Sequence, residues 1–272
     1  MSASPWLPIF AGIAADIRSQ LGPLAGSRRG REVVGTGAGG DRTVVLDAVA
    51  EEIAVRHLEK AYRSGLRFRL LSEELGARDF GGDPVVLIDP LDGSLNAKQG
   101  VPYYAVVLAH AHGDTLGDVE LALVHNLATA DEFTAQRGGG AHRNGRPIPS
   151  QGPEPADRYP LVQLEAPRPL EAVERARAVI ERAERLRVLG SVGLNLCHTA
   201  TGAISLTLAP LPVRAFDLAG PLLILREAGG SATDFQGSDL APVASALSSR
   251  TTLLAAATPA GHARALELLA GR

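Results

Sequence analysis

Apolar residues near the start of the chain recur at helical spacing. Trp6, Phe10, Ile13 and Ile17 lie three or four positions apart, which places them on one face of a helix. A Gly-Pro pair at positions 22–23 predicts the end of this helix. We expect its apolar face to pack against a core.

Apolar runs in the middle of the chain indicate strands. Residues 85–88 are Val-Val-Leu-Ile, which is typical of a strand covered on both faces. Four further strands, the last three in a meander, are predicted at 68–71, 101–109, 120–126 and 132–135. An Asn-Gly pair at 144–145 predicts a hairpin turn.

The Pro- and Gly-rich stretch at 150–160 predicts a boundary in the chain. We expect an N-terminal α+β subdomain over residues 1–150 and a C-terminal α/β subdomain over residues 151–272. In the second subdomain the pattern predicts a strand at 161–164, a helix at 171–189, and a helix that runs through 221–230. This alternation of strands and helices favours the α/β class.

Composition limits the classes of function. The 272 residues are 45% hydrophobic, enough for a core, and the net charge of −3 leaves no basic surface for nucleic acid. The one cysteine, Cys197, excludes an internal disulfide and a thiolate zinc site. No stretch reaches the roughly 18 apolar residues of a membrane span. We therefore expect a cytoplasmic protein with a small-molecule substrate and no nucleic-acid or membrane partner.

Residues 35–40, Gly-Thr-Gly-Ala-Gly-Gly, match the glycine pattern of dinucleotide-binding sites, and Glu59 lies about 20 residues further on. The context disfavours that function, because only Val33 and Val34 could form the preceding strand and polar residues interrupt before the next helix. We interpret the segment as a glycine-rich loop before a helix that begins near Thr43.

The chemistry of the chain is concentrated directly after the apolar run at 85–88. Pro90 lacks an N–H, so we expect the sheet ladder to stop there and the chain to turn. Asp89 and Asp92 flank this turn and would aim two carboxylates and the Leu91 carbonyl into one volume, and hard divalent cations prefer such oxygens. Two ordinary Asp-Pro and Asp-Gly turns are the alternative, but a strand that leads directly into both acids favours a site.

Two small residues follow the acids. Gly93 lets the backbone approach a ligand closely, and Ser94 adds a hydroxyl at the start of the next helical turn. The free N–H groups at such a start bind anions. The segment therefore predicts an anion-binding place beside the cations.

Residues 89–96, Asp-Pro-Leu-Asp-Gly-Ser-Leu-Asn, resemble the Asp-Pro-(Ile/Leu)-Asp-Gly-(Thr/Ser)-x-Asn element of the inositol monophosphatase and fructose-1,6-bisphosphatase superfamily. Ala97 replaces the Phe that usually follows, which affects packing more than chemistry. Residues 216–220 and 227–230, Phe-Asp-Leu-Ala-Gly and Glu-Ala-Gly-Gly, are similar to the family's second element. The resemblance implies a layered αβαβα sandwich, with the site in the cleft between two subdomains.

The resemblance also implies roles for individual residues. Ser-Glu-Glu at 72–74 is similar to a Gly-Glu-Glu element whose first Glu binds metal, and residues 43–47 resemble the start of the family's second helix. The implied metal ligands are Glu73, Asp89, the Leu91 carbonyl, Asp92 and Asp217. The implied catalytic residues are Ser94, Glu73 and Asp47. The implied substrate contacts are Asp92, Gly93, Ser94, Gly190, Ser191, Arg214 and Asp217.

A site built from oxygen ligands selects Mg²⁺, or Mn²⁺, over zinc. Two or three ions would gather among these acids, and the family implies inhibition by Li⁺ and a homodimer. A water of lowered pKa would attack phosphorus in line, without a covalent intermediate. Ser94 would orient or deprotonate that water together with Glu73 or Asp47.

The resemblance leaves the substrate open. Animal-type inositol monophosphatases have a Glu seven residues before the last metal Asp, where this chain has Pro210. Arg214 lies nearer to Asp217 in the sequence. It either holds a second phosphate or pairs with a neighbouring acid to position Asp217. The chain is most similar to the dual-activity archaeal-type group, so we expect inositol-1-phosphate, fructose-1,6-bisphosphate or both. The alternatives are 3′-phosphoadenosine-5′-phosphate, another small phosphate ester, and a catalytically inactive phosphate-binding relative.

Overall fold

The computed structural model describes residues 4–38, 42–152 and 158–271. Its helices are α1 (Trp6–Leu21), α2 (Val45–Arg63), α3 (Ser94–Gln99), α4 (Pro169–Ile180), α5 (Val192–Ala200), α6 (Ala219–Glu227) and α7 (Pro259–Ala270), with 3-10 turns η1 (Arg29–Arg31), η2 (Leu116–Asp118) and η3 (Phe216–Leu218). Within these ranges, none of the helices combines the length and the apolar character that crossing a membrane requires.

Two sheets carry most of the strands. The larger sheet contains β3 (Arg69–Ser72), β4 (Gly76–Asp79), β5 (Val85–Asp92), β6 (Ala105–Ala111), β7 (Val119–Asn126), β8 (Glu132–Gln136), β9 (Gly140–Arg143) and β10 (Arg146–Pro147). The smaller sheet contains β11 (Val162–Leu164), β12 (Leu186–Arg187), β13 (Leu206–Arg214), β14 (Ser231–Thr233) and β15 (Arg250–Ala256). The strand orders are β10-β9-β8-β7-β6-β5-β3-β4 and β12-β11-β13-β15-β14.

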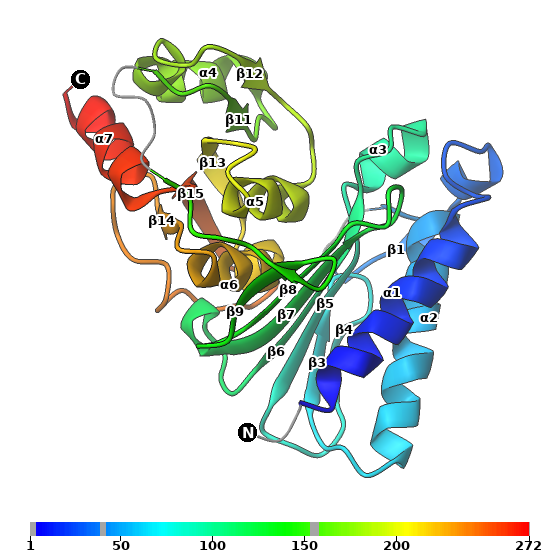
Figure 1. Cartoon of the computed structure of the whole chain (residues 1–272). Coiled ribbons are helices and arrows are strands. Elements are labelled where there is room, and N and C mark those ends of the chain that lie inside the picture. Colours follow the sequence, from blue (N-terminus) through cyan, green and yellow to red (C-terminus); the bar gives the residue numbers. More distant parts are fainter. Residues whose placement is uncertain (1–3, 39–41, 153–157, 272) are drawn as a thin grey trace.

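Helices and sheets alternate in five layers, which confirms the predicted αβαβα sandwich (Figure 1). Alternation along β5 connects two of the cores, because Val86 and Ile88 pack with α1 and α2 while Val85 and Leu87 pack with α5 and α6. Helices α4 and α7 cover the outer face of the smaller sheet.

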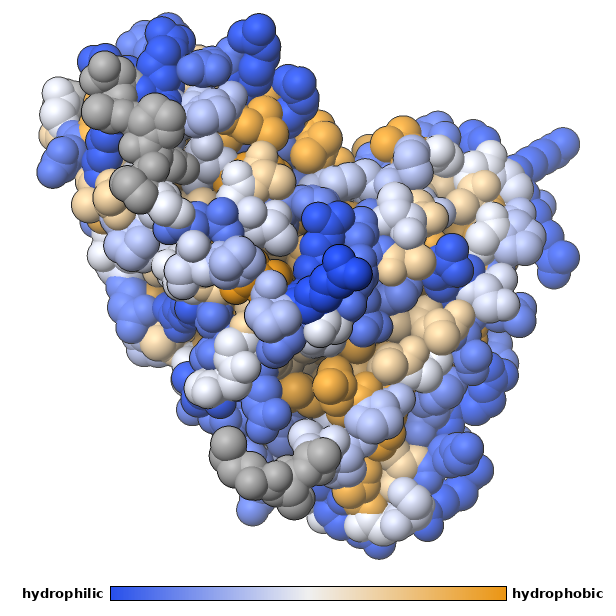
Figure 2. Space-filling model, in the orientation of Figure 1, coloured by the Kyte–Doolittle hydropathy of each residue, from blue (hydrophilic) through white to orange (hydrophobic). Residues whose placement is uncertain are grey.

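Helices α5 and α6 join the two sheets into one core. Their side chains pack with Val107 of the larger sheet and with Ala209 and Leu253 of the smaller sheet. Figure 2 shows a notch in the surface between the part that carries α4 and the part that carries α3. Since α3 directly follows β5, the end of this strand belongs to one side of the notch.

Strand β5 is buried along its whole length, as the apolar run predicts, but it does not stop at Pro90. The strand continues to Asp92, and its register with β6 shifts between Asp89 and Asp92. The missing N–H of Pro90 is accommodated by this irregularity and does not end the ladder. The prediction that the ladder stops at Pro90 is therefore wrong.

The glycine-rich segment belongs to a hairpin. Strands β1 (Val33–Thr36) and β2 (Arg42–Val44) pair antiparallel and form a separate two-stranded sheet next to α2. Residues 39–41 lie outside the described ranges. A dinucleotide site needs a parallel strand-helix-strand unit, so this antiparallel pairing agrees with the interpretation that the glycine pattern is incidental.

The helix predicted over 171–189 is shorter in the structure, where α4 ends at Ile180. Tyr159 donates its N–H to the carbonyl of Arg182 and accepts the N–H of Glu184, which draws this segment into an extended bridge. A tertiary contact thus overrides local helical preference.

The hairpin predicted at 144–145 is confirmed, because β9 and β10 pair across Asn144 and Gly145 and both residues have positive φ.

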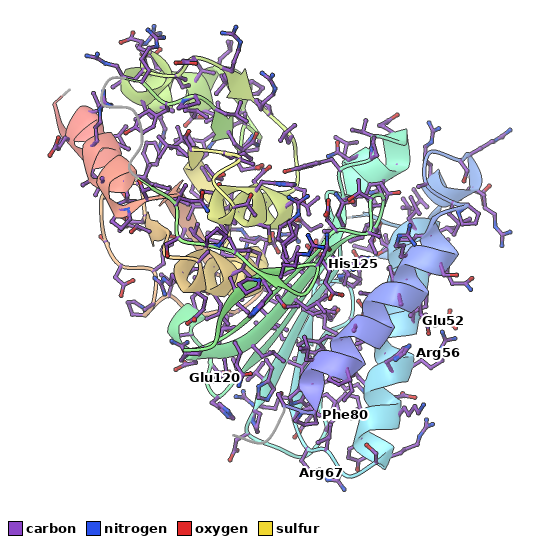
Figure 3. All side chains as sticks on the ribbon, in the orientation of Figure 1. Glu52, Arg56, Arg67, Phe80, Glu120 and His125 are labelled. Carbon is purple, nitrogen blue, oxygen red and sulfur yellow. The ribbon has the colours of Figure 1, made fainter. Side chains whose placement is uncertain are left out.

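Helix α1 buries the apolar face that its sequence predicts. Phe10 and Ile13 are fully buried between α1 and the rest of the core. On the neighbouring α2, Glu52 and Arg56 are exposed and point away from the sheet (Figure 3). The stability of this layer therefore depends on the buried stripe and not on the charged surface.

Replacing Ile13 by Ala should lower the free energy of unfolding by about 2–4 kcal/mol, because the truncation leaves a cavity beneath α1. Leu7→Ala on the same helix is the control, since Leu7 is 37% exposed, and its loss should stay below about 1 kcal/mol. Urea unfolding followed by circular dichroism measures both. Equal losses for the two variants would contradict the packing of α1.

Candidate functional site

Two acids of the site are brought together by parallel strand pairing. Strand β3 pairs parallel with β5, and Ser72 lies opposite Ile88 in the register. The paired segments therefore end side by side, with Glu73 directly after β3 and Asp89 as the next residue within β5. The N–H of Glu73 donates to the carbonyl of Ile88 at 3.2 Å, which fixes the two acids as neighbours.

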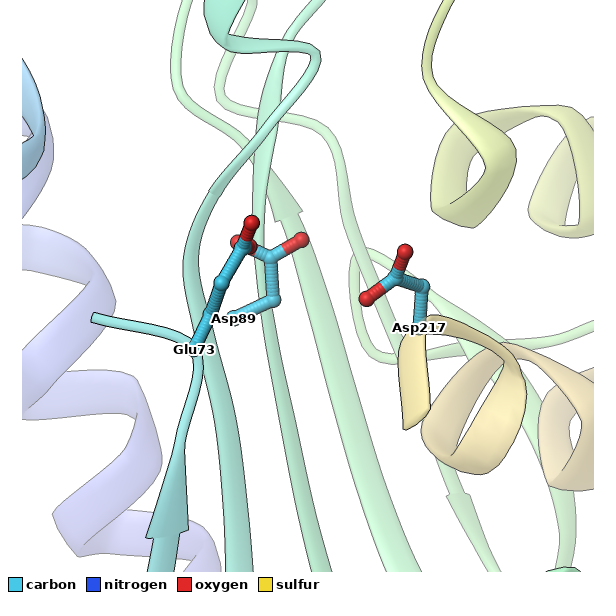
Figure 4. Close-up of side chains that lie close together, drawn as sticks. All are labelled: Glu73, Asp89 and Asp217. Atoms are coloured by element: carbon cyan, nitrogen blue, oxygen red, sulfur yellow. The ribbon is translucent and has the colours of Figure 1, made fainter. Parts of the chain in front are cut away.

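The third acid comes from the smaller sheet. Asp217 lies in η3, three residues after the end of β13, and its carboxylate faces Glu73 and Asp89 across a short gap (Figure 4). One oxygen from each of the three side chains lies within 4.8 Å of the other two. Carboxylates at this spacing can share a divalent cation.

Burial makes this group electrostatically unfavourable when it is empty of cations. The pKa of Asp89 is raised well above its ordinary value, first by burial and then by the charges of Glu73 and Asp217. Burial also raises the pKa of Asp217 to about 8, although Arg214 opposes the shift. A cation between the carboxylates would remove the repulsion.

Arg214 supplies part of that positive charge. Its guanidinium pairs with Glu73 through Nη1, and its Nε lies 3.3 Å from Asp217 Oδ2. Burial lowers the pKa of Arg214, but the surrounding acids outweigh this effect and raise the pKa above its ordinary value. Arg214 therefore connects an acid of the larger sheet with an acid of the smaller sheet.

The donor set fits a small, hard cation. A cavity of about 20 Å³, close to the volume of one water molecule or ion, is lined by Asp47, Glu73, Glu74, Asp89, Pro90, Leu91 and Ser94. Asp217 Oδ1 is buried and has no hydrogen-bond partner among the residues that the structure describes. Buried carboxylate oxygens of this kind are satisfied by a metal ion. The geometry thus supports an oxygen-ligated ion and no soft metal.

Asp92 lies outside the group of three. Its Oδ2 accepts hydrogen bonds from Ser191 Oγ at 2.6 Å and from the N–H of Gly193 at 2.8 Å. Burial raises the pKa of Asp92 to about 6, while the hydrogen bond from Ser191 opposes the shift. The aspartate therefore ties the end of β5 to the first turn of α5.

A close backbone contact accompanies this link. Gly93 has φ +82°, and a Cβ at this position would lie 3.0 Å from the carbonyl oxygen of Tyr103 and 3.1 Å from that of Gly190. Asn96 donates from Nδ2 to the carbonyls of Tyr103 and Leu189 at 2.8 and 2.6 Å. The predicted substrate residues Gly93, Gly190 and Ser191 thus lie together, although they come from two distant parts of the chain.

Asp47 and Ser94 are connected by a lysine. Lys98 Nζ lies 3.6 Å from Asp47 Oδ2 and donates to Ser94 Oγ at 3.5 Å. Asp47 also accepts the N–H of Val44 at 3.0 Å. Burial raises the pKa of Asp47, and the Val44 hydrogen bond and Lys98 oppose the shift.

The structure adds two acids that sequence reasoning missed or left without a role. Glu51 accepts the hydroxyl of Ser72 at 2.6 Å, and burial raises its pKa to about 7. Glu74 accepts the hydroxyl of Thr43 at 2.6 Å, and this contact links the turn after β3 to the β1–β2 hairpin. Glu51 belongs to no recognised motif. Only its position on the inner face of α2 could have indicated that it lies near the site.

The raised pKa of Asp217 predicts a pH-dependent instability of the metal-free protein. Since the pKa is about 8 in the folded state and about 3.9 in the unfolded chain, the folded state binds the extra proton between these values. Stability therefore falls as the pH rises, from no effect below about pH 4 to the full effect above about pH 8.

Asp217→Asn removes this penalty. In EDTA, the melting temperature of the variant relative to wild type should rise steadily from about pH 5 to about pH 9. The exposed Asp83 provides a control, and Asp83→Asn, which removes a carboxylate outside the buried group, should not reproduce this rise. A difference between Asp217→Asn and wild type that does not depend on pH would contradict the electrostatic account.

Comparisons with known proteins agree with this geometry. The sequence profile of the inositol monophosphatase family matches residues 10–271. The chain is 31% identical over 240 residues to the fructose-1,6-bisphosphatase/inositol-1-monophosphatase of Methanocaldococcus jannaschii, which covers 86% of this chain and 88% of that protein. It is 32% identical over 276 residues to the protein of the same name from Methanothermobacter thermautotrophicus, with 97% and 96% covered.

A solved structure of an inositol monophosphatase–fructose 1,6-bisphosphatase superimposes with a TM-score of 0.85 at 28% identity, covering 97% of this chain and 100% of the other. Sequence and fold thus agree over nearly the whole length. The chain belongs to the inositol monophosphatase family.

Proposed function

We propose that this chain, a phosphoric monoester hydrolase by its family, is a Mg²⁺-dependent enzyme that hydrolyses a small sugar or cyclitol phosphate. The proposed substrates are inositol-1-phosphate, fructose-1,6-bisphosphate or both. The observation that carries the proposal is the convergence of Glu73, Asp89 and Asp217 from both sheets, beside a cavity of ion size. Oxygen ligands alone favour Mg²⁺ over softer metals.

The bound ions would supply positive charge to the phosphate oxygens and a water of lowered pKa. Glu73, Asp89 and Asp217 would hold the ions, together with Asp92 and the Leu91 carbonyl. Asp92 would contribute through Oδ1, because its Oδ2 accepts hydrogen bonds from Ser191 and Gly193.

Ser94 and Asp47 are the proposed groups that orient the water and accept its proton. Ser94 Oγ accepts a hydrogen bond from Lys98, so its own O–H is available to donate. Burial raises the pKa of Asp47, which makes its carboxylate a better proton acceptor than an exposed one. Glu73 is the alternative acceptor.

The phosphate is proposed to contact the N–H groups of Gly93 and Ser94, and the hydroxyls of the substrate to contact Gly190 and Ser191. The close approach of Gly93 to Gly190 supports this assignment, because it brings both contacts to one place.

Asp89→Asn should lower Mg²⁺-dependent phosphate release by at least about a hundredfold, since one carboxylate ligand is lost. Phosphate release from inositol-1-phosphate, fructose-1,6-bisphosphate and 3′-phosphoadenosine-5′-phosphate is measured with Mg²⁺ and with EDTA. Asp83→Asn changes an exposed acid before the same strand and should retain full activity.

Three results of this assay separate the alternatives. Release that is lost in EDTA and in Asp89→Asn supports the proposal. Wild-type protein that hydrolyses none of the esters would instead indicate an inactive phosphate-binding relative. Full turnover by Asp89→Asn would contradict the assignment of the metal site.

Arg214→Ala should reduce turnover of both inositol-1-phosphate and fructose-1,6-bisphosphate by similar factors, roughly tenfold or more. The reason is that Arg214 contacts Glu73 and Asp217, so its loss disturbs the proposed metal ligands for every substrate. Steady-state kinetics with both esters measures the two losses. A loss confined to fructose-1,6-bisphosphate would instead assign Arg214 to a second phosphate.

Several finer features belong to the same proposal. Li⁺ is proposed as an inhibitor that competes for the ion sites. The division into 1–150 and 151–272 is proposed because the chain passes from the larger to the smaller sheet between β10 and β11. A homodimer, a cytoplasmic location and the lack of nucleic-acid and membrane partners stay predictions.

A further inference from the structure

Glu165 is an acid that the proposed mechanism does not use. It directly follows β11, which pairs parallel with β13 (Figure 1). The C-terminal ends of these strands therefore point to the same edge of the smaller sheet, and β13 leads at that edge into η3 with Asp217. Ligands of α/β proteins bind at such strand ends.

A chain of hydrogen bonds fixes the orientation of Glu165. Asn195 on α5 donates from Nδ2 to Glu165 Oε1 and accepts the hydroxyl of Tyr103 at 2.8 Å on Oδ1. Gln163 Nε2 also donates to Glu165 Oε1 at 3.3 Å. Asn195 lies one helical turn after Ser191, whose hydroxyl contacts Asp92. The network thus extends from Glu165 to Ser191, which is one of the proposed substrate contacts.

The second carboxylate oxygen of Glu165, Oε2, is available to a ligand. Both hydrogen bonds end on Oε1, whereas Oε2 has no hydrogen-bond or ion-pair partner in the described part of the chain. The residue is half-buried, so this oxygen is not sealed in the core. Burial and the charge of Asp92 raise the pKa of Glu165 to about 7. An acid held in this unfavourable setting without a cation is more typical of a ligand contact than of a structural one.

We infer that Glu165 is a specificity-determining residue whose Oε2 accepts a hydrogen bond from a hydroxyl of the alcohol part of the substrate. This inference rests on the proposed phosphatase function. A carboxylate attracts hydroxyl donors and repels a second phosphate, so Glu165 favours polyhydroxylated monophosphates over bisphosphates. The charge of Glu165 disfavours a second phosphate beside it. Arg214 does not offset this charge, because it pairs with Glu73 and Asp217.

The test compares three esters with Mg²⁺: inositol-1-phosphate, fructose-1,6-bisphosphate, and p-nitrophenyl phosphate, whose alcohol part has no further hydroxyl. Glu165→Ala should lower kcat/KM for inositol-1-phosphate by roughly tenfold to a hundredfold, mainly through KM, and change p-nitrophenyl phosphate less than about threefold. The preference for fructose-1,6-bisphosphate over inositol-1-phosphate should increase. Glu184→Gln changes an exposed acid of the same half and is the control.

Glu165→Gln covers the case in which the alanine variant does not fold, since its amide oxygen can keep the contact with Asn195. The Gln variant should show the same order of losses with smaller factors. Equal losses on all three esters would assign Glu165 to the support of α5 and overturn the inference, as would unchanged kinetics. Wild-type protein that hydrolyses none of the esters would overturn the proposed function itself, and the inference with it.

Discussion

The mutual repulsion of buried carboxylates is the constraint on which the site depends. Glu73, Asp89 and Asp217 lie close together, although burial and like charge both oppose the ionisation of Asp89 and Asp217. Parallel pairing of β3 with β5 holds the first two, and the core shared through α5 and α6 holds the third opposite them. Stability of the scaffold is thus used to maintain an unfavourable charge arrangement, and Arg214 offsets only part of it.

Much of the fold follows from local pattern, and its errors have specific physical causes. The apolar run at 85–88 identifies the interior strand β5, because that strand is buried on both faces. Pro90 does not end that strand, because a register shift absorbs the missing N–H, and such shifts leave no signal in the sequence. The helix predicted to 189 stops at Ile180, because a bridge to Tyr159 competes with helix formation. Both corrections depend on contacts between segments distant in sequence.

The candidate site was predictable where a motif fixes the chemistry. Asp89 and Asp217 stand in recognisable elements, and the structure brings their carboxylates together. Lys98 and Glu51 have no such signal, because each lies on a different helix and approaches the acids only through tertiary packing. Sequence reasoning therefore identified the acids that converge in the structure and missed neighbouring groups that only tertiary packing brings to them.

The distribution of charge along the site gives the substrate a direction. One end collects cations, because Arg214 and the proposed ions lie among the carboxylates, and it attracts the phosphate. Our inference places the acid Glu165 at the other end, where its Oε2 is suited to a neutral hydroxyl and unsuited to a second anion. Asp92 accepts the hydroxyl of Ser191 and so ties β5 to α5, the helix whose Asn195 donates to Glu165. A ligand with one phosphate and several hydroxyls matches this polarity, whereas a bisphosphate matches only one half of it.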